Sequence, residues 1–241
     1  MQPYLFPYLG YFDLIHYADR WIVFDEAQFI RRGWVNRNRI LHPQHGWQYI
    51  GVPVSRAPQQ TPIREIVIHG EGDWKRRMCS QIEHYRKTAP NYRRVRDLLI
   101  RILEPDLSRI VDLNVRALSM VCAYIGLDFR YDLISNLPVI RSRINGPEDW
   151  ALQLCELTGA DEYANLPGGR GLYRYSEFEN RGLKLTFREL PRMSYDCPGY
   201  DFMPDLSIID VLMWNEPENV MEHLRLNENQ DTTSRQEVGD E

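Results

Sequence analysis

The sequence predicts an α/β protein with a mixed or parallel central sheet, flanking helices and a helical middle segment. Three observations support this class: short β-rich apolar runs in the first seventy residues, helical periodicity from about residue 73 to 126, and a return to mixed strands and helices afterwards. The chain has 241 residues, of which 43% are hydrophobic, so it is long enough to bury a hydrophobic core.

The first seventy residues contain three predicted strands. The run "RWIVFDEAQF" places apolar residues before acids, as a buried strand does when it delivers polar groups at its carboxyl end. The runs "WQYIGVPV" and "IREIVIHG" are two further strands, separated by the proline-rich loop "SRAPQQTP". The segment "GYFDLIHYA", which precedes the first strand, is a short helix.

The middle of the chain is predicted to be helical. The segment "DWKRRMCSQIEHYRKTAP" begins with an acidic cap and stops at a proline, as a helix does. The segments "NYRRVRDLLIRIL" and "LSRIVDLNVRALSMVCAYIGL" continue as two more helices, the second of which ends at Gly126.

Strands and helices alternate again in the last part. "GPEDWALQLCELTGA" is a helix with Pro147 in its first turn and Gly159 beyond its end. "DEYANLPGGRGLY" reads as a strand leading into a glycine-rich turn, "GLKLTFREL" as a strand and "LSIIDVLMW" as a helix. Ser207 and Asp210 fit the N-cap and the N3 partner of this helix better than they fit a catalytic serine site.

The domain organisation follows from these elements. Residues 1–226 are expected to form a single α/β domain with the helical segment at about 73–126, since no flexible linker interrupts them. Residues 227–241 carry five acids, one arginine and one apolar residue, so we expect a disordered acidic tail.

Composition disfavours several classes of function. No stretch approaches 18 consecutive apolar residues and no secretory signal is visible, so we expect a cytoplasmic protein without a membrane span. The four cysteines lie far apart with no metal-binding spacing, which predicts free thiols and no metal site. The net charge of −5 and the absence of a nucleic-acid motif make nucleic acid an unlikely partner.

The opening "MQPYLFPYLGYF" concentrates aromatic residues and prolines. Two prolines restrict its backbone, so the rings could form a stiff stacking wall. The candidate substrate-binding residues in this segment are Gln2, Tyr4, Tyr8 and Tyr11. The alternative, in which the rings are only core, leaves the two prolines less explained.

Three polar residues, Asp25, Glu26 and Gln28, follow the predicted strand "WIVF". Ligands of open α/β sheets bind at the carboxyl ends of strands, which makes Asp25 and Gln28 candidate catalytic residues. The carboxylate of Asp25 could act as a base or bind an amine. The alternative is an acid that caps or salt-bridges the end of a strand.

The segment "RRGWVNRNRI" is the sharper polar cluster. The amides of Asn36 and Asn38 could hydrogen-bond a developing oxyanion, and Arg37 could bind a phosphate or carboxylate bidentately. Trp34 offers a flat face for a substrate. A polar turn beside a buried tryptophan is the alternative, and composition does not separate the two.

The segment from Lys75 to Arg101 holds nine basic residues and two acids. Its residues Lys75, Arg76, Arg77 and Arg86 could dock an anionic partner, such as an acyl carrier protein or the phosphorylated arm of coenzyme A. The alternative is a solvated helix face.

Two further features are weaker. "LPGGRG" resembles a phosphate-cradling turn but lacks the full nucleotide-binding motifs, so a simple turn is favoured. Cys79 lies next to basic residues that could depress its pKa, although a free cysteine is more often an inert small hydrophobe.

Together these segments resemble the WbqC-like protein family. The resemblance covers residues 2 to 214 and rests on "QPYLFPYLGYFDLI", "FDEAQFIRRGWVNRNRIL", "IREIVI", "YANLPGG" and "LSIIDVL". Family members usually carry an apolar strand before "QPY", whereas Met1 directly precedes Gln2 here, so the sequence either starts late or lacks that strand. Met78 and Cys79 stand where a histidine is expected, which puts any acid–base role of that histidine in doubt.

The resemblance implies a role in the synthesis of O-antigen and other surface polysaccharides. It implies transfer of an acyl or aminoacyl group to an amino sugar or other amine, with a carrier-protein or coenzyme A thioester as donor and no tightly bound cofactor. The positions it points to are Gln2, Pro3, Tyr4, Pro7, Tyr8, Gly10, Tyr11, Asp25, Gln28, Trp34, Asn36, Arg37 and Asn38.

Two alternatives remain at the level of sequence. The first is a nucleotide-using ligase or nucleotidyltransferase-like enzyme, although Tyr8 and Tyr11 stand where such folds place a histidine pair. The second is a non-catalytic binding module of a glycan assembly complex, which would depend on the basic segment rather than on Asp25.

Overall fold

The structure is a computed structural model that describes residues 1–70 and 72–237, with side chains described through residue 227. The helices are α1 (Leu9–Tyr17), α2 (Trp74–Gln81), α3 (Tyr92–Leu103), α4 (Ile110–Ile125), α5 (Pro147–Thr158), α6 (Tyr175–Glu179), α7 (Ile208–Trp214) and α8 (Pro217–Glu237). The strands are β1 (Trp21–Val23), β2 (Arg37–Leu41), β3 (Trp47–Gly51), β4 (Tyr131–Leu133), β5 (Glu162–Asn165) and β6 (Lys184–Phe187). Short 3-10 turns are η1 (Ile63–Glu65), η2 (Glu83–Lys87), η3 (Ile134–Asn136), η4 (Arg141–Arg143) and η5 (Pro167–Leu172).

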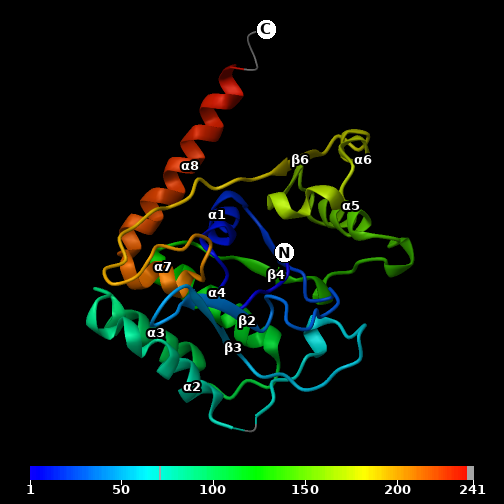
Figure 1. The fold of residues 1–241 in the computed structure, drawn as a ribbon. Helices are drawn as coiled ribbons and strands as arrows, with labels where there is room; N and C mark the ends of the chain where they lie inside the picture. Colours follow the sequence, from blue (N-terminus) through cyan, green and yellow to red (C-terminus); the bar gives the residue numbers. More distant parts are fainter. Residues whose placement is uncertain (71, 238–241) are drawn as a thin grey trace.

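The α/β class is confirmed, with the strands divided among three small sheets in the part of the chain that the structure describes. β1 pairs with β4 and β5 pairs with β6, both in parallel, whereas β2 and β3 form an antiparallel hairpin. The strands therefore do not join into one central sheet. Figure 1 shows the hairpin in the lower half of the molecule and β5–β6 with α5 and α6 at one side.

The predicted strand "IREIVIHG" is wrong. Its first part is the 3-10 turn η1, and Val67 and Ile68 make only isolated bridges. Ile63 and Ile66 are both buried, and their spacing of three suits one 3-10 turn rather than an alternating strand. The prolines before it, Pro53 and Pro62, cannot donate to a ladder, which explains why β3 does not continue into this segment.

The other predicted helices are confirmed, but the helix predicted to run from Asp73 to the proline ends at Gln81, and the 3-10 turn η2 follows it. The helix ends follow local signals. The side chain of Asp73 caps α2 by accepting a hydrogen bond from the Arg76 amide at 3.3 Å. Gly126 and Gly159 end α4 and α5 in the left-handed conformation, with φ of 77° and 68°. The Ser207 hydroxyl caps α7, but Asp210 is not its capping partner because its carboxylate turns to other elements.

Two apolar clusters fill the interior. The larger contains side chains of the N-terminal segment, α1 to α4, the hairpin and α7 and α8. The smaller lies between α5, α6 and β6 and consists of Ala151, Leu152, Phe178 and Leu185. Residues 1–226 were expected to form one domain, and this remains a prediction.

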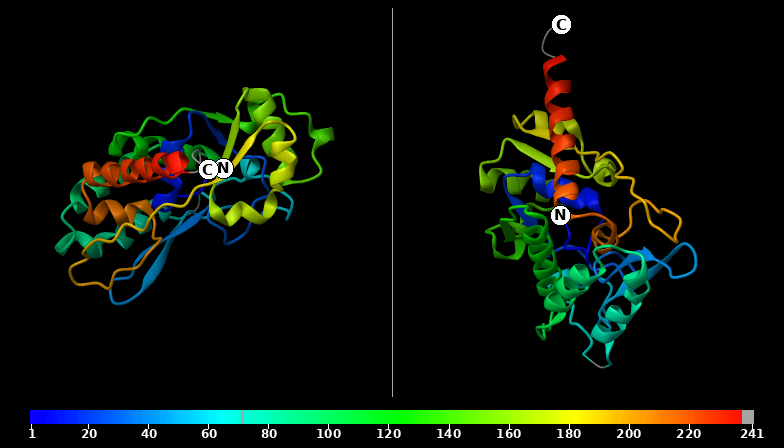
Figure 2. Two further views of the ribbon diagram at one scale, coloured as in Figure 1. Left: turned by 90° about the horizontal axis from the view of Figure 1, so that it is seen from above. Right: turned by 90° about the vertical axis from the view of Figure 1, so that its left-hand side faces the viewer.

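The last helix differs from the expectation of a disordered tail after residue 226. Helix α8 runs on to Glu237 and extends beyond the body of the molecule in Figure 1 and in the right-hand view of Figure 2. Val220, Leu224 and Asn227 are buried. Packing of this first half stabilises the initial turns of the helix, to which further turns can then be added. Residues 238–241 lie outside the described residues.

Candidate functional site

The N-terminal segment before α1, residues 1–8, is called the leader here. Buried polar side chains fix the shape of its backbone. The side-chain amide of Asn38 donates to the carbonyl oxygens of Leu5 and Phe6 at 3.0 and 2.9 Å, and the Ser207 hydroxyl also donates to Phe6, at 2.8 Å. Phe6 has a φ of 43°, a left-handed conformation that costs roughly 1–3 kcal/mol in a bulky residue. The three hydrogen bonds hold that conformation in place.

A second buried amide holds the start of the leader. The side chain of Asn114, in α4, donates to the carbonyl oxygens of Pro3 and Val35, both at 2.7 Å. The Tyr11 hydroxyl donates to the carbonyl oxygen of Gln2. Side chains of β2, α1 and α4 and of the N-cap of α7 therefore position the backbone of the leader.

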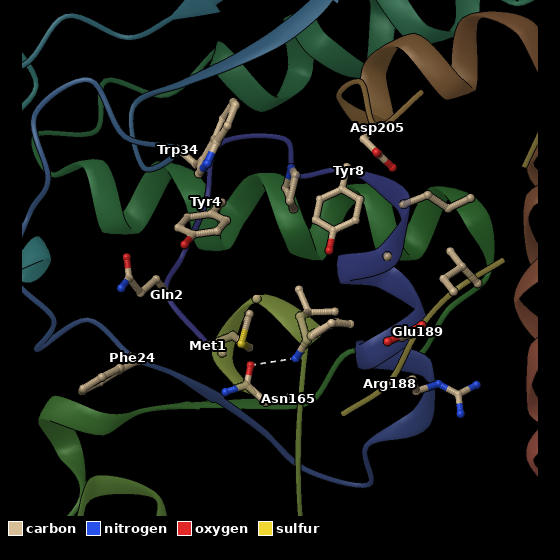
Figure 3. Close-up of a pocket in the computed structure, with 18 of the residues that line it drawn as sticks. Met1, Gln2, Tyr4, Tyr8, Phe24, Trp34, Asn165, Arg188, Glu189 and Asp205 are labelled. Carbon is tan, nitrogen blue, oxygen red and sulfur yellow. Dashed lines mark hydrogen bonds between the residues drawn. The ribbon is translucent and has the colours of Figure 1, made fainter. Parts of the chain in front are cut away.

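The leader forms one wall of a cavity of about 1240 Å³. The other walls come from residues 24–28 after β1, residues 144–150 before and within α5, residues 163–173 around β5 and η5, residues 188–195 after β6, and residues 202–206 before α7. Figure 3 shows Tyr4 and Tyr8 of the leader facing this space, with Asn165 and Arg188 on the opposite side. The leader and five other chain segments thus meet around one opening.

The structure brings six of the predicted site residues to this cavity. They are Gln2, Tyr4, Tyr8, Gln28, Trp34 and Asn38. Gln28 donates its side-chain amide to the carbonyl oxygen of Gln59 at 2.6 Å, and both donors of Asn38 are engaged by the leader. Asn38 therefore has no free hydrogen to offer an oxyanion, and its role here is to position the leader.

Four predicted site residues do not line the cavity, namely Tyr11, Asp25, Asn36 and Arg37. The carboxylate of Asp25 is buried and accepts hydrogen bonds from the backbone and hydroxyl of Ser135 at 3.1 and 2.7 Å. It joins the end of β1 to η3, which fits the capping alternative. Tyr11 is fully buried against Trp21, with ring centroids 5.1 Å apart.

Asn36 and Arg37 also point away from the cavity. The side-chain amide of Asn36 donates to the carbonyl oxygen of Val52 at 3.0 Å and so joins the base of the hairpin. Arg37 lies over the ring of Tyr49, with 3.9 Å between the guanidinium carbon and the ring centroid. The side chains of Asn36, Arg37 and Asn38 thus contact three different parts of the molecule, namely Val52, Tyr49 and the leader.

Glu26 lines the cavity in place of its neighbour Asp25. Its carboxylate pairs with Arg64 at 2.9 Å and with Arg141, whose Nη1 donates to it at 2.9 Å. The hydrogen bond from Arg141 is the largest cause that lowers the pKa of Glu26. Glu26 is therefore a paired carboxylate suited to structure or charge balance rather than to proton transfer.

Tyr4, Tyr8 and Asp205 form the most reactive part of the wall. Burial raises the pKa of Tyr4 and of Tyr8, and the charge of Asp205 raises that of Tyr8 further, so both phenols stay protonated and can donate hydrogen bonds. Asp205 lies beside the Tyr8 ring (Figure 3) and has a φ of 56°, while no ion pair joins it to a cation among the described residues. A carboxylate thus adjoins the ring of Tyr8, and Tyr4 lies further along the same wall.

Several lining residues were not predicted as site residues from sequence. They include Trp150, Asn165, Tyr163, Tyr173 and Arg188. Asn165 donates to the Tyr173 hydroxyl at 3.0 Å and accepts from the Leu166 amide at 2.7 Å, which shapes the turn "LPGGRG". The signal that could have found them was the "YANLPGG" motif. In the structure this turn is the 3-10 element η5, at the cavity wall.

The basic segment is only partly available to a partner. Lys75 pairs with Asp106 at 2.7 Å and Arg76 pairs with its own cap Asp73. Arg77 and Arg86 are exposed.

Cys79 is not activated. Burial raises the pKa of its thiol, which is opposite to the depression that a nucleophile needs. In the described part of the chain, no group of three or more metal-binding side chains is found, and no helix is long and apolar enough to cross a membrane.

Comparison with known proteins identifies one family and one relative. The model of the "WbqC-like protein family" matches residues 2–222. The chain is 30% identical over 228 residues to "Uncharacterized protein Rv1507c" of Mycobacterium tuberculosis (strain ATCC 25618 / H37Rv), which covers 88% of this chain and 90% of that protein. No solved structure matches the chain significantly.

Proposed function

This chain belongs to the WbqC-like protein family, and from that membership and the cavity behind the leader we propose that it is a transferase of surface-polysaccharide biosynthesis. It moves an acyl or aminoacyl group from a thioester donor to the nitrogen of an amino sugar or similar amine. A volume of about 1240 Å³ accommodates a sugar together with the group it receives. Aromatic walls suit the apolar faces of a sugar ring.

The observation that most supports the proposal is the grouping of Tyr4, Tyr8 and Asp205 on one wall. Asp205 accepts a proton from the substrate ammonium, which frees the nitrogen lone pair. The nitrogen then forms a bond to the thioester carbonyl carbon, and the Tyr4 and Tyr8 hydroxyls donate hydrogen bonds to the oxygen as it becomes negative. The carbonyl re-forms as the carbon–sulfur bond breaks, and the leaving thiolate takes up the second proton, which the nitrogen loses as it becomes an amide. Asp25, first expected as the base, has no part in this scheme.

The donor is a thioester of coenzyme A or of an acyl carrier protein. Arg77 and Arg86 are the residues of the basic segment that best suit contact with its phosphates, because Lys75 and Arg76 already have carboxylate partners.

The direct test is mass spectrometry of reaction mixtures. The purified protein is incubated with amino sugars, both free and as nucleoside diphosphate esters, and with acyl and aminoacyl thioesters. The mass of the transferred group should appear on the amine. The Asp205→Asn variant should lose about 10²- to 10⁴-fold in rate, as expected for loss of a general base. Asp201→Asn, an exposed carboxylate outside the cavity, is the matched control. Absence of product with every thioester would overturn the proposal.

A further inference from the structure

The outer face of the β2–β3 hairpin carries a row of arginines and aromatic rings, here called the platform. Arg37 lies 3.9 Å from the centroid of Tyr49, whose ring meets that of Trp47 edge-on at 4.9 Å. The guanidinium of Arg39 is 5.3 Å from the ring of Trp47 and 5.3 Å from that of Trp34. The platform therefore runs in the order Arg37, Tyr49, Trp47, Arg39, Trp34.

The pairing register explains why these side chains share a face. Arg39 pairs directly with Tyr49, and residues two apart along a strand point the same way. The alternate residues Asn38, Ile40 and Ile50 face inward and are buried. The hairpin thus has one face in the core and one face that carries the platform.

The rings of the platform are open to solvent. Trp34, Trp47 and Tyr49 are 39%, 39% and 36% exposed, which is unusual for large aromatic side chains placed side by side. Their faces can accept a flat group, because stacking on aromatic rings is tolerant of the identity of the ring that binds.

The arginines of the platform carry uncompensated charge. Arg37 donates to the carbonyl oxygen of Arg32, and Arg39 donates to that of Asp205 at 3.3 Å. Neither makes an ion pair with a carboxylate among the residues that the structure describes. The Nε atoms of both are buried without a hydrogen-bond partner. Two guanidinium groups of this kind suit phosphate oxygens, which accept several charge-assisted hydrogen bonds.

The platform is continuous with the cavity. Trp34 and Arg39 belong to both, whereas Trp47, Tyr49 and Arg37 extend the surface outward. Figure 3 shows Trp34 on the cavity wall above Tyr4. A ligand that follows the row inward meets Arg37 and the open rings of Tyr49 and Trp47 first, then the guanidinium of Arg39, then Trp34 and the cavity.

We propose that the platform binds the nucleoside diphosphate portion of an activated amino sugar. The base stacks on Trp47 and Tyr49, beside the guanidinium of Arg37, the diphosphate contacts Arg39, and the sugar passes Trp34 into the cavity. The order of base, diphosphate and sugar in such a substrate matches the order of the rings, Arg39 and the cavity. This inference rests on the proposed function, because it names the form in which the amino sugar is presented.

Single-stranded nucleic acid and coenzyme A also combine a base with phosphates. Nucleic acid suits the surface less well, since the chain has a net charge of −5. Coenzyme A would bring a long flexible arm rather than a sugar to the opening. Both serve as competing ligands in the test.

The test measures binding by calorimetry and by quenching of tryptophan fluorescence, with UDP, CDP, GDP and dTDP as probes. At least one probe should bind the wild-type protein, and its affinity should fall about tenfold or more in Trp47→Ala and in Arg37→Ala. Trp47→Phe keeps a stacking ring and should recover most of the affinity. Tyr131→Ala, on β4, and Arg93→Ala, on α3, remove an exposed ring and an exposed charge outside the cavity and serve as matched controls.

The proposal is overturned if none of the four nucleotides binds the wild-type protein, or if binding is equal in Trp47→Ala, Arg37→Ala and the controls. It is also overturned if only coenzyme A or a single-stranded oligonucleotide depends on Trp47. Formation of product from free amino sugars without nucleotide binding would remove this inference and leave the proposed function intact. Nucleotide binding at the platform without any transfer would leave this inference intact and remove the proposed function.

Discussion

The side-chain amide of Asn38, in β2, donates a hydrogen bond of 2.9 Å to the carbonyl oxygen of Phe6, 32 residues earlier in the chain. This bond fixes a left-handed residue in front of Pro7, a place where the backbone otherwise prefers an extended conformation. The shape of the cavity wall therefore depends on Asn38, a residue whose side-chain donors are both bonded to the leader itself.

Replacing Asn38 by alanine should destabilise the protein strongly. The carbonyl oxygen of Leu5 would lose its buried donor, at a cost of about 1–3 kcal/mol, whereas that of Phe6 would keep the Ser207 hydroxyl and lose one of two bonds, at about 0.5–1.5 kcal/mol. Urea unfolding should report a total loss of roughly 1.5–4.5 kcal/mol. Asn36→Ala removes a single bond, to Val52, and should cost less. Equal losses in the two variants would contradict this role for Asn38.

Asp25→Asn and Asp205→Asn should separate stability from activity. Asp25 accepts two hydrogen bonds from Ser135, so an amide there loses an acceptor and lowers the melting temperature, while the transfer rate of the folded protein stays near that of the wild type. Asp205→Asn should keep the melting temperature and lose the rate. Calorimetry and the mass-spectrometric assay give both values. A collapse in rate for Asp25→Asn in the folded protein would restore the assignment first made from sequence.

Gly10→Ala should disturb the cavity rather than the helix. A Cβ at this position would lie 2.5 Å from Cε2 of Tyr8, so the ring must move away from its place in the wall. Alanine is otherwise favourable within a helix, by up to about 1 kcal/mol. The expected result is a small change in unfolding free energy with a clear loss of amino-sugar affinity in calorimetry. Gly126 is no control, because its φ is positive; Ser119→Ala in α4 is a better one.

The buried ion pair of Asp13 and Arg188 should be costly to break. Their side chains are 0% and 1% exposed, the closest contact is 2.7 Å, and Asn227 donates to Asp13 at 3.0 Å. Arg188→Met leaves a buried carboxylate without its cation, which should cost about 3–5 kcal/mol in urea unfolding. Arg130→Met removes the exposed pair with Asp128 and should have little effect. Similar small losses in both would show that Asp13 is compensated by other groups.

Asp210 should give stability a distinctive dependence on pH. Burial raises its pKa from 3.8 to about 6, while Tyr85 and Tyr195 donate hydrogen bonds to it. Because the folded state binds the proton more tightly than the unfolded state, this group contributes most stability below pH 4 and loses it as the pH rises to about 6. The difference in unfolding free energy between wild type and Asp210→Asn should fall by about 3 kcal/mol between pH 4 and pH 7. A difference that stays constant would contradict the raised pKa.

Sequence reasoning succeeded where the signal was local. Helix caps at Asp73, Gly126 and Gly159 depend on one or two residues, so they were readable from the chain itself. The α/β class followed from the same local patterns. The division of the strands into three sheets did not, because pairing depends on contacts between distant segments.

The candidate site was predicted in part for a similar reason. The sequence predicted that residues of the leader and Trp34 would contact a ligand, and both line the cavity. It could not decide between the neighbours Asp25 and Glu26, because adjacent residues after a strand point to opposite sides. It also missed Asp205 and Asn165, which reach the cavity from segments distant from the leader in sequence.

The bond between Ser207 and Phe6 spans 201 residues, which has a consequence for synthesis of the protein. Phe6 leaves the ribosome long before Ser207, so during translation its carbonyl oxygen lacks the hydroxyl donor that Ser207 later supplies. A nascent chain that stops before α7 should carry helices and the hairpin but no finished binding wall. Competence to bind ligand should then arise late and abruptly, once the final helices have been released and packed.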